Sequence, residues 1–146
     1  MVQSPQRGSH LRPWLEGLNA GMVAFDLGLG VLAIVAPRSG LRLLGHRTPS
    51  DDAAWLFRRC GPIWLTFAAA HLTAARRGAP RDWWALGWLR GAEIATDALW
   101  AQSPAFREDA RARWALRLAG VANTGMALGF GRLGARPERP PAAAGG

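Results

Sequence analysis

One uninterrupted apolar segment constrains this chain more than any other feature. Residues 17–36, GLNAGMVAFDLGLGVLAIVA, contain a single charged side chain, Asp26, and Pro37 follows them directly. A helix rises 1.5 Å per residue, so this segment extends about 30 Å, which matches the hydrocarbon core of a bilayer. A secretory signal has a shorter apolar run and a cleavage site of small residues. We therefore predict that a first helix, Trp14 to Ala36, is a retained membrane span.

Three further segments are predicted to be helices, and short polar turns join them. Residues 50–52, Ser-Asp-Asp, supply an N-cap and an acidic first turn for a helix that covers about 53–75. The other two helices are predicted at 83–102 and at about 114–133. Because short turns favour antiparallel neighbours, the expected fold is all-α, a four-helix transmembrane bundle that runs up-down-up-down.

The chain of 146 residues has the length of one domain. Residues 1–13 are predicted to be a flexible N-terminal segment and residues 134–146 a disordered C-terminal tail, which leaves 14–133 as the membrane domain. Residues 37–52 mix leucines with arginines. This connection is therefore expected to lie at the membrane interface, with its leucines toward the acyl chains.

The tryptophans favour a bilayer over water as the surroundings of the helices. They fall at the ends of the predicted helices, as the aromatic belts of membrane proteins do, whereas a soluble bundle would hold them in mid-helix. The residues concerned are Trp14, Trp55, Trp83, Trp84, Trp100 and Trp114. The first and fourth helices are also apolar around most of their circumference, which helices facing water are not.

Glycines recur at the spacing of close helix packing. Gly17 with Gly21, and Gly125 with Gly129, match the G-x-x-x-G pattern of membrane helices. We expect these residues to lie at helix–helix contacts or at faces that dock another subunit.

The predicted third helix carries charges that oppose the membrane hypothesis. Arg90, Glu93 and Asp97 lie three and four residues apart, so a helix places all three on one face. At mid-membrane each costs about 2.5–3.5 kcal/mol. The mean hydropathy of the chain is −0.01, so a soluble helical bundle is the alternative. In a bilayer these side chains must face the other helices or a polar cavity.

Polar residues on the other helices could meet these charges. Asn19 and Asp26 share one face of the first helix, and arginines lie near the starts of the second and fourth. Arg90 is expected to neutralise Glu93 in its own helix, which leaves Asp97 or Asp26 for an arginine of a neighbour. The candidate polar site comprises Asp26, His71, Arg90, Glu93, Asp97 and Asn123. It either fixes helix register or lines a cavity for a headgroup, a quinone-like ligand, a cation or a proton.

Other functional classes find no support in the sequence. The single cysteine, Cys60, excludes an internal disulfide and a zinc site built on several thiolates. No nucleotide-binding, hydrolase or metalloprotease motif occurs, and haem would usually want a second intramembrane ligand beside His71. The net charge of +8 comes from arginines spread along the chain, with no lysine, so nucleic-acid binding is not expected. We predict no catalytic residue, no metal and no cofactor.

Two segments and the helices that follow them resemble a known group of proteins. These are PRSGLRLLG, residues 37–45, after the first helix, and FRRCGPIWLTFAAAHL, residues 57–72, in the second. Together with two further helices of similar length, they look like the small four-span bacterial membrane proteins called DoxX-like. The resemblance covers about residues 15–133. It implies an accessory role, because some members of that group are linked to membrane redox systems as accessory subunits.

The expected function is that of a non-enzymatic integral membrane protein, an accessory or scaffold subunit of an inner-membrane complex. The alternatives are a small ligand-binding or proton- or cation-coupled transport protein that uses the intramembrane acidic residues, and a soluble helical bundle. The expected location is the bacterial cytoplasmic membrane with both termini inside, since a slight excess of arginines then lies on the cytoplasmic side. The expected partners are the bilayer and other membrane subunits or further copies of the chain.

Overall fold

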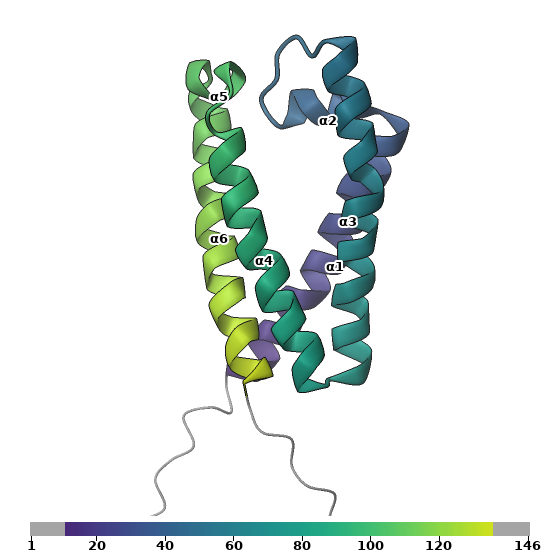
Figure 1. The fold of residues 1–146 in the computed structure, drawn as a ribbon, viewed down its shortest axis with the longest axis vertical. Helices are drawn as coiled ribbons and strands as arrows, with labels where there is room; N and C mark the ends of the chain where they lie inside the picture. Colours follow the sequence, from purple (N-terminus) through teal and green to yellow (C-terminus); the bar gives the residue numbers. More distant parts are fainter. Residues whose placement is uncertain (1–10, 136–146) are drawn as a thin grey trace, which may run out of the picture.

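The computed structural model describes residues 11–135, which contain six helices and no strand (Figure 1). The helices are α1 (Leu11–Val35), α2 (Pro37–Leu43), α3 (Asp51–Arg77), α4 (Pro80–Trp100), α5 (Pro104–Glu108) and α6 (Ala110–Gly134). The all-α prediction is confirmed for this part of the chain. The predicted N-terminal segment 1–13 and C-terminal tail 134–146 lie mostly outside the described residues.

The four long helices, α1, α3, α4 and α6, run alternately up and down and form two antiparallel pairs (Figure 1). α1 packs along α3 and α4 packs along α6, whereas contacts between the two pairs are sparse. The pairs approach each other at the end where α1 begins and α6 ends, and they diverge toward α2 and α5 (Figure 1). The fold therefore consists of two helical hairpins that meet at one end.

Side-chain caps fix where α3 and α6 begin. The Ser50 hydroxyl accepts a hydrogen bond from the Ala53 N–H at 3.2 Å, so the predicted cap of the second long helix is confirmed. The Asp109 carboxylate accepts from two backbone N–H groups of the next turn, at 2.8 and 3.2 Å. These hydrogen bonds lower the pKa of Asp109 below its usual value. Because Asp109 is the cap, α6 begins ahead of Trp114, where the sequence had placed its start.

Several segments predicted to be irregular are helical. Residues 11–13 form the first turn of α1, and both predicted connections at the diverging end contain a short helix, α2 or α5. Each short helix begins with a proline, Pro37 or Pro104, which suits the first helical position because that N–H has no partner there. The prediction for Leu41 is wrong: this side chain is buried against Phe57 instead of facing outward.

The two hairpins share one local pattern at the start of their second long helix. Trp55 follows the Ser50 cap by five residues (50 to 55), and Trp114 follows the Asp109 cap by five (109 to 114). Three residues further on, an arginine stacks over each indole, with the guanidinium carbon 4.6 Å from the Trp55 ring and 5.6 Å from the Trp114 ring. The hairpins are therefore built alike, as long helix, short helix and capped long helix.

Glycines permit the close approach within each pair. A Cβ added to Gly30 would lie 3.0 Å from the Gly61 carbonyl oxygen, and one added to Gly61 would lie 2.9 Å from the Gly30 carbonyl oxygen. In the other pair, a Cβ added to Gly87 would lie 3.0 Å from the Gly131 nitrogen. In each case the added Cβ would meet the backbone of the neighbouring helix, so a side chain at Gly30, Gly61 or Gly87 would push the helices apart.

The glycines singled out by their spacing do not make these contacts. A Cβ added to Gly17, Gly21 or Gly125 would have no atom within 4 Å, while one added to Gly129 would meet the side chain of Leu15. The expectation of a helix–helix contact within the chain is therefore wrong for three of these four residues. A G-x-x-x-G spacing places glycines on one helix face, but it does not show whether that face meets a neighbour.

Replacing Gly61 by alanine is expected to lower the free energy of unfolding by about 1–3 kcal/mol, since the new methyl would overlap the Gly30 carbonyl oxygen. Gly21→Ala is the matched control, because its methyl meets nothing and alanine favours the helix by up to about 1 kcal/mol. Thermal unfolding followed by circular dichroism compares the two. A Gly61→Ala variant as stable as the wild type would contradict the close contact of α1 and α3.

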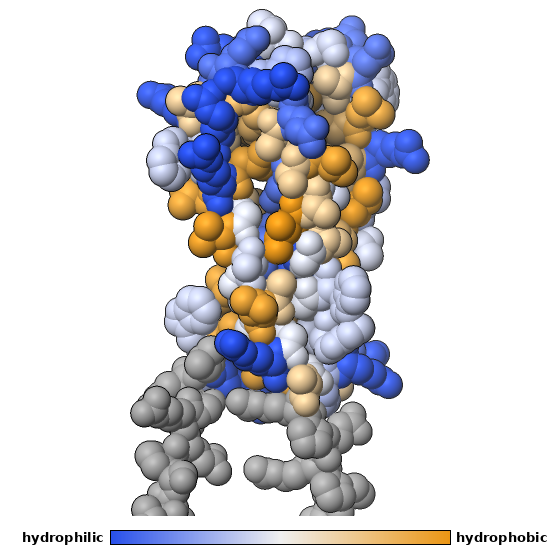
Figure 2. All heavy atoms as spheres, turned by 60° about the vertical axis from the view of Figure 1, so that its left-hand side comes forward, coloured by the Kyte–Doolittle hydropathy of each residue, from blue (hydrophilic) through white to orange (hydrophobic). Residues whose placement is uncertain are grey.

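Several polar side chains are fully buried beside the apolar core, while many large apolar side chains are exposed. Four of the six largest fully buried side chains are polar, namely Arg90, His71, Asn19 and Asp26. Large apolar side chains are exposed on every long helix, among them Val31, Leu56, Leu99 and Val121. Figure 2 shows hydrophobic residues gathered over the middle of one face and hydrophilic ones toward its two ends. Charged side chains are seldom fully buried unless they are paired, so the buried Asp26 and Arg90 call for partners in the interior.

Four of the five exposed tryptophans lie toward the ends of the molecule, whereas the fifth, Trp88, is the ninth of the 21 residues of α4. Trp14 and Trp84 stand near the end where the pairs meet, and Trp55 and Trp114 stand near the diverging end. These four agree with the distribution expected of aromatic belts. Trp83 departs from it, because it is 4% exposed and belongs to the apolar core between the helices.

Candidate functional site

A buried polar cluster joins the two helix pairs. It consists of Asn19 and Asp26 on α1, His71 on α3 and Arg90 on α4, none of them more than 2% exposed. Asn19 and Asp26 are seven residues apart, two helical turns, so both point to the interior side of α1. The cluster therefore draws side chains from three helices into one desolvated layer.

Arg90 is the centre of this cluster. Its Nη2 donates to the Asp26 carboxylate across the gap between the pairs, and its Nε donates to His71 Nε2 at 3.1 Å. The Phe67 ring lies 5.7 Å from the guanidinium carbon. The hydrogen bonds and the opposite charge offset part of the cost of removing both groups from water, while Asp26 Oδ1 has no hydrogen-bond partner among the described residues.

Asn19 fixes the protonation pattern of His71. The Asn19 amide donates to the His71 carbonyl oxygen at 3.0 Å, so its Oδ1 faces His71 Nδ1 at 2.6 Å. Nδ1 must therefore carry the proton, because Oδ1 can only accept. Nε2 is then the lone-pair nitrogen of a neutral imidazole, which suits the donation from Arg90. The two contacts on the ring require the same tautomer.

The charge pairing differs from the sequence prediction. Arg90 pairs with Asp26 of α1, and in residues 11–135 no ion pair joins it to Glu93 of its own helix. The reason is burial: Asp26 is fully buried, so its carboxylate has more to gain from a counter-ion than the partly buried Glu93. The arginines considered as partners stay outside the cluster, since Arg58 and Arg117 stack on tryptophans and Arg59 is exposed.

Asn19 was absent from the predicted candidate site, although it stands at the centre of the His71 contacts. Its seven-residue spacing from Asp26 was the available signal, because it marked a polar stripe on an otherwise apolar helix. The structure brings Asp26, His71 and Arg90 together with Asn19. It places Glu93, Asp97 and Asn123 on the diverging side of this cluster, where α4 faces α6.

A cavity of about 490 Å³ lies between the pairs and is bordered by these three residues. Its remaining walls are mostly apolar and come from all four long helices, from α5 and from Leu44 after α2, with Arg90 at one side. The polar lining residues are Arg90, Glu93, Asp97 and Asn123, and the apolar ones include Met22, Phe25, Leu29, Trp64, Leu116, Leu118, Ala119, Ala122 and Met126. Asn123 donates to Asp97 at 3.3 Å. Size and lining are those of a small-molecule site.

Glu93 is the one acidic wall residue whose carboxylate makes no hydrogen bond or ion pair with another side chain in residues 11–135. It is partly buried, on the same face of α4 as Arg90 and Asp97. A carboxylate at such a position is available to a molecule in the cavity.

Aromatic side chains close the cavity toward the diverging end. Trp100 and Phe106, both in the cavity wall, pack edge to face with ring centroids 4.9 Å apart. His46, from the segment after α2, stacks on Trp100 at 5.7 Å and meets Phe106 edge-on at 5.5 Å. Burial lowers the pKa of His46, so this ring is neutral at neutral pH. The contacts of His46 with Trp100 and Phe106 therefore join the two hairpins a second time, at the diverging end of the cavity.

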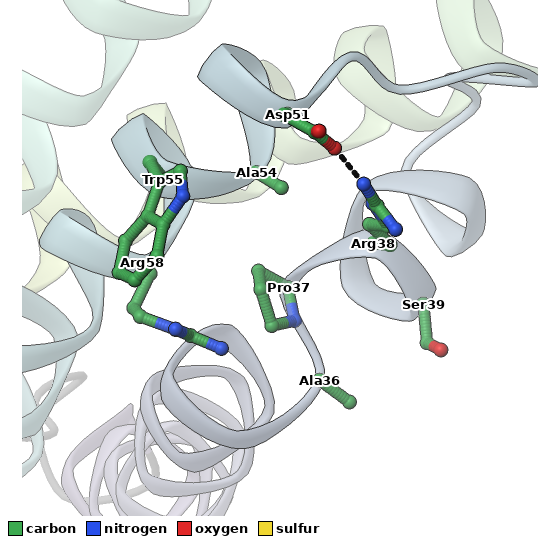
Figure 3. Close-up of a pocket in the computed structure, with 8 residues that line it drawn as sticks. All are labelled: Ala36, Pro37, Arg38, Ser39, Asp51, Ala54, Trp55 and Arg58. Carbon is green, nitrogen blue, oxygen red and sulfur yellow. Dashed lines mark ion pairs between the residues drawn. The ribbon is translucent and has the colours of Figure 1, made fainter.

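A second hollow, of about 300 Å³, lies where α1 passes into α2 (Figure 3). Two arginines line it, and both have partners: Arg38 pairs with Asp51, and Arg58 stacks on Trp55. Within residues 11–135, no group of three His, Cys, Asp or Glu side chains is placed to hold a metal ion. The cavity between the pairs is therefore the best candidate for a functional site.

The chain matches no protein-family model, no curated protein and no solved structure. The resemblance to the DoxX-like group therefore stays a prediction.

Replacing Arg90 by methionine is expected to cost about 3–5 kcal/mol of unfolding free energy, because the Asp26 carboxylate would stay buried without a counter-ion. The double variant Asp26→Leu/Arg90→Met should recover most of this loss, since no buried charge remains. Arg117→Met is the control, because Arg117 is exposed and should change stability little. Chemical unfolding of the four proteins measures the difference. Equal losses in the single and double variants would show that the ion pair is not the cause.

Proposed function

We propose that this protein is a multi-pass helical membrane protein that binds a small, mostly apolar molecule between its two helix pairs. The membrane part rests on two features: the buried polar residues Asn19, Asp26, His71 and Arg90, and the large apolar residues exposed on every long helix. In a bilayer both features are favourable, because the helices shield the buried charges and the apolar exterior contacts hydrocarbon. The soluble alternative would expose this apolar surface to water.

Helix lengths support the same proposal. The long helices have 25, 27, 21 and 25 residues, which corresponds to about 32–40 Å each. One of them, over Arg12–Val35, is long and apolar enough to cross a membrane by itself. The mean hydropathy of its most apolar stretch is 1.9, and 22% of that stretch is buried. A core helix of a soluble protein would be mostly buried. The other three long helices would cross as partners of α1, with their charged residues at the ends or turned inward.

The ligand-binding part rests on one observation, the cavity of about 490 Å³ with mostly apolar walls and a few polar groups. Such a lining suits a molecule that is itself mostly apolar. The wall residues Phe25 and Leu118 are 58% and 64% exposed, so the rim between α1 and α6 is apolar. A ligand would therefore reach the cavity sideways from the lipid phase.

A second candidate function is the accessory or scaffold role. Gly17, Gly21 and Gly28 on α1 have nothing within 4 Å of an added Cβ, and apolar residues such as Leu27 and Val31 on the same helix are exposed. Small and apolar residues of this kind favour packing against another membrane helix. A bacterial cytoplasmic membrane with both termini inside remains the proposed location. It agrees with Leu11 and Ala135, the ends of the described chain, lying at one end of the molecule (Figure 1).

Expression followed by carbonate washing tests the membrane part. The protein is expected to stay in the membrane pellet after washing and to dissolve when detergent is added, because its exterior is apolar. A protein that enters the carbonate supernatant would be soluble or peripheral, and that outcome would rule out the proposed function.

The fluorescence of the tryptophans tests the cavity. Trp64 and Trp100 line it, so a brominated hydrocarbon that binds there should quench part of the emission in a saturable way. Ala122→Trp places a large side chain in the wall and should abolish saturable quenching. Ala85→Trp on the exposed face of α4 is the control and should keep it, since Ala85 does not line the cavity. Quenching that is unsaturable, or unchanged by Ala122→Trp, would contradict a ligand site.

A further inference from the structure

We infer that the molecule bound in the cavity is an amphiphilic cation, with an ammonium-like head against Glu93 and Asp97 and a hydrocarbon body against α1 and α6. This inference rests on the proposed function and adds the chemical class of the ligand. It is carried by two independent features of the cavity, its charge balance and its aromatic lining.

Acidic side chains outnumber basic ones around the cavity. The interior holds three carboxylates, Asp26, Glu93 and Asp97, and one guanidinium, Arg90, which is engaged by Asp26 and His71. Asp97 receives a hydrogen bond from Asn123, a neutral donor. Within residues 11–135, no arginine or histidine makes an ion pair with Glu93 or Asp97. A cation placed between them would stabilise the ionised form of both carboxyl groups.

Four aromatic rings line the same cavity, and they point to the same ligand class. They belong to Phe25, Trp64, Trp100 and Phe106. The face of an aromatic ring carries partial negative charge and attracts alkylammonium groups, which are weakly hydrated and lose little on leaving water. The neutral His46 ring behind Trp100 adds no positive charge that would repel such a head. Carboxylates and aromatic rings together favour a cation over an anion of equal size.

The residues that line the cavity indicate where the head and the hydrocarbon chain of the ligand would lie. Its polar residues Glu93 and Asp97 are one turn apart on α4, whereas the α6 wall is formed mainly by apolar residues such as Leu116, Leu118 and Ala122. The exposed rim at Phe25 and Leu118 continues this apolar wall to the outside. A single hydrocarbon chain can therefore lie along α6 and reach the lipid phase while its charged head stays beside α4.

The experiment compares three probes that differ in their head group: octyltrimethylammonium, octanol and octanoate. The wild-type protein in nanodiscs of zwitterionic lipid is titrated with each at neutral pH by calorimetry, with empty nanodiscs as the blank. We expect the ammonium probe to bind at least about tenfold more tightly than the other two, since it alone can pair with the carboxylates. This comparison needs no variant and does not depend on how well a mutant folds.

Variants then locate the head group. Glu93→Gln and Asp97→Asn should each weaken the ammonium probe by about tenfold and leave octanol unchanged. Asp52→Asn, an exposed site at the start of α3, is the control and should change neither probe. Circular dichroism confirms that each variant is folded.

The possible outcomes separate the two proposals. Equal binding of the three probes, tighter binding of octanoate, or loss of octanol together with the ammonium probe in folded Glu93→Gln and Asp97→Asn would overturn the cationic ligand. Each of these leaves the proposed binding function standing. Failure of all three probes to bind would overturn the proposed function and this inference with it.

Discussion

The contact of Arg90 with Asp26 and His71 is the interaction on which the rest of the structure depends. Here a carboxylate of one helix pair forms an ion pair with a guanidinium of the other, and both groups are buried. A buried ion pair offsets its cost of desolvation only when its partners hold each other closely and make further hydrogen bonds. Asn19 contributes by holding His71 in the tautomer that accepts from Arg90. The polar cluster thus sets the position and rotation of α1, α3 and α4 at one level of the molecule.

The cavity follows from this arrangement. Below the cluster, the apolar core of Leu15, Leu86 and Phe130 holds the pairs together; above it, the pairs diverge until His46 meets Trp100 and Phe106. The space between these two contacts is bordered by the acidic residues of α4 and the apolar face of α6. Acidic side chains on one wall and hydrocarbon on the other give the cavity its amphiphilic character.

The sequence predicted the elements of the fold better than their contacts. The long apolar run of α1 and the Ser50 cap were visible because each depends on local chemistry, namely hydropathy over twenty residues and one side-chain hydrogen bond. The partner of Arg90 was predicted wrongly, because i, i+3 spacing favoured Glu93 while the real choice depended on which carboxylate is most deeply buried. The close-packed glycines were missed for a similar reason: Gly30 and Gly61 lie on different helices, and no spacing within one helix relates them.

The turn between the hairpins, at Gly78 and Ala79, connects two units of the same design, each a long helix, a short proline-led helix and a capped helix with an arginine over its tryptophan. Each unit keeps its own glycine-lined interface, Gly30 with Gly61 and Gly87 with Gly131. Each hairpin therefore aligns its own two long helices, and only the sparse contacts between the hairpins determine how the two units sit against each other.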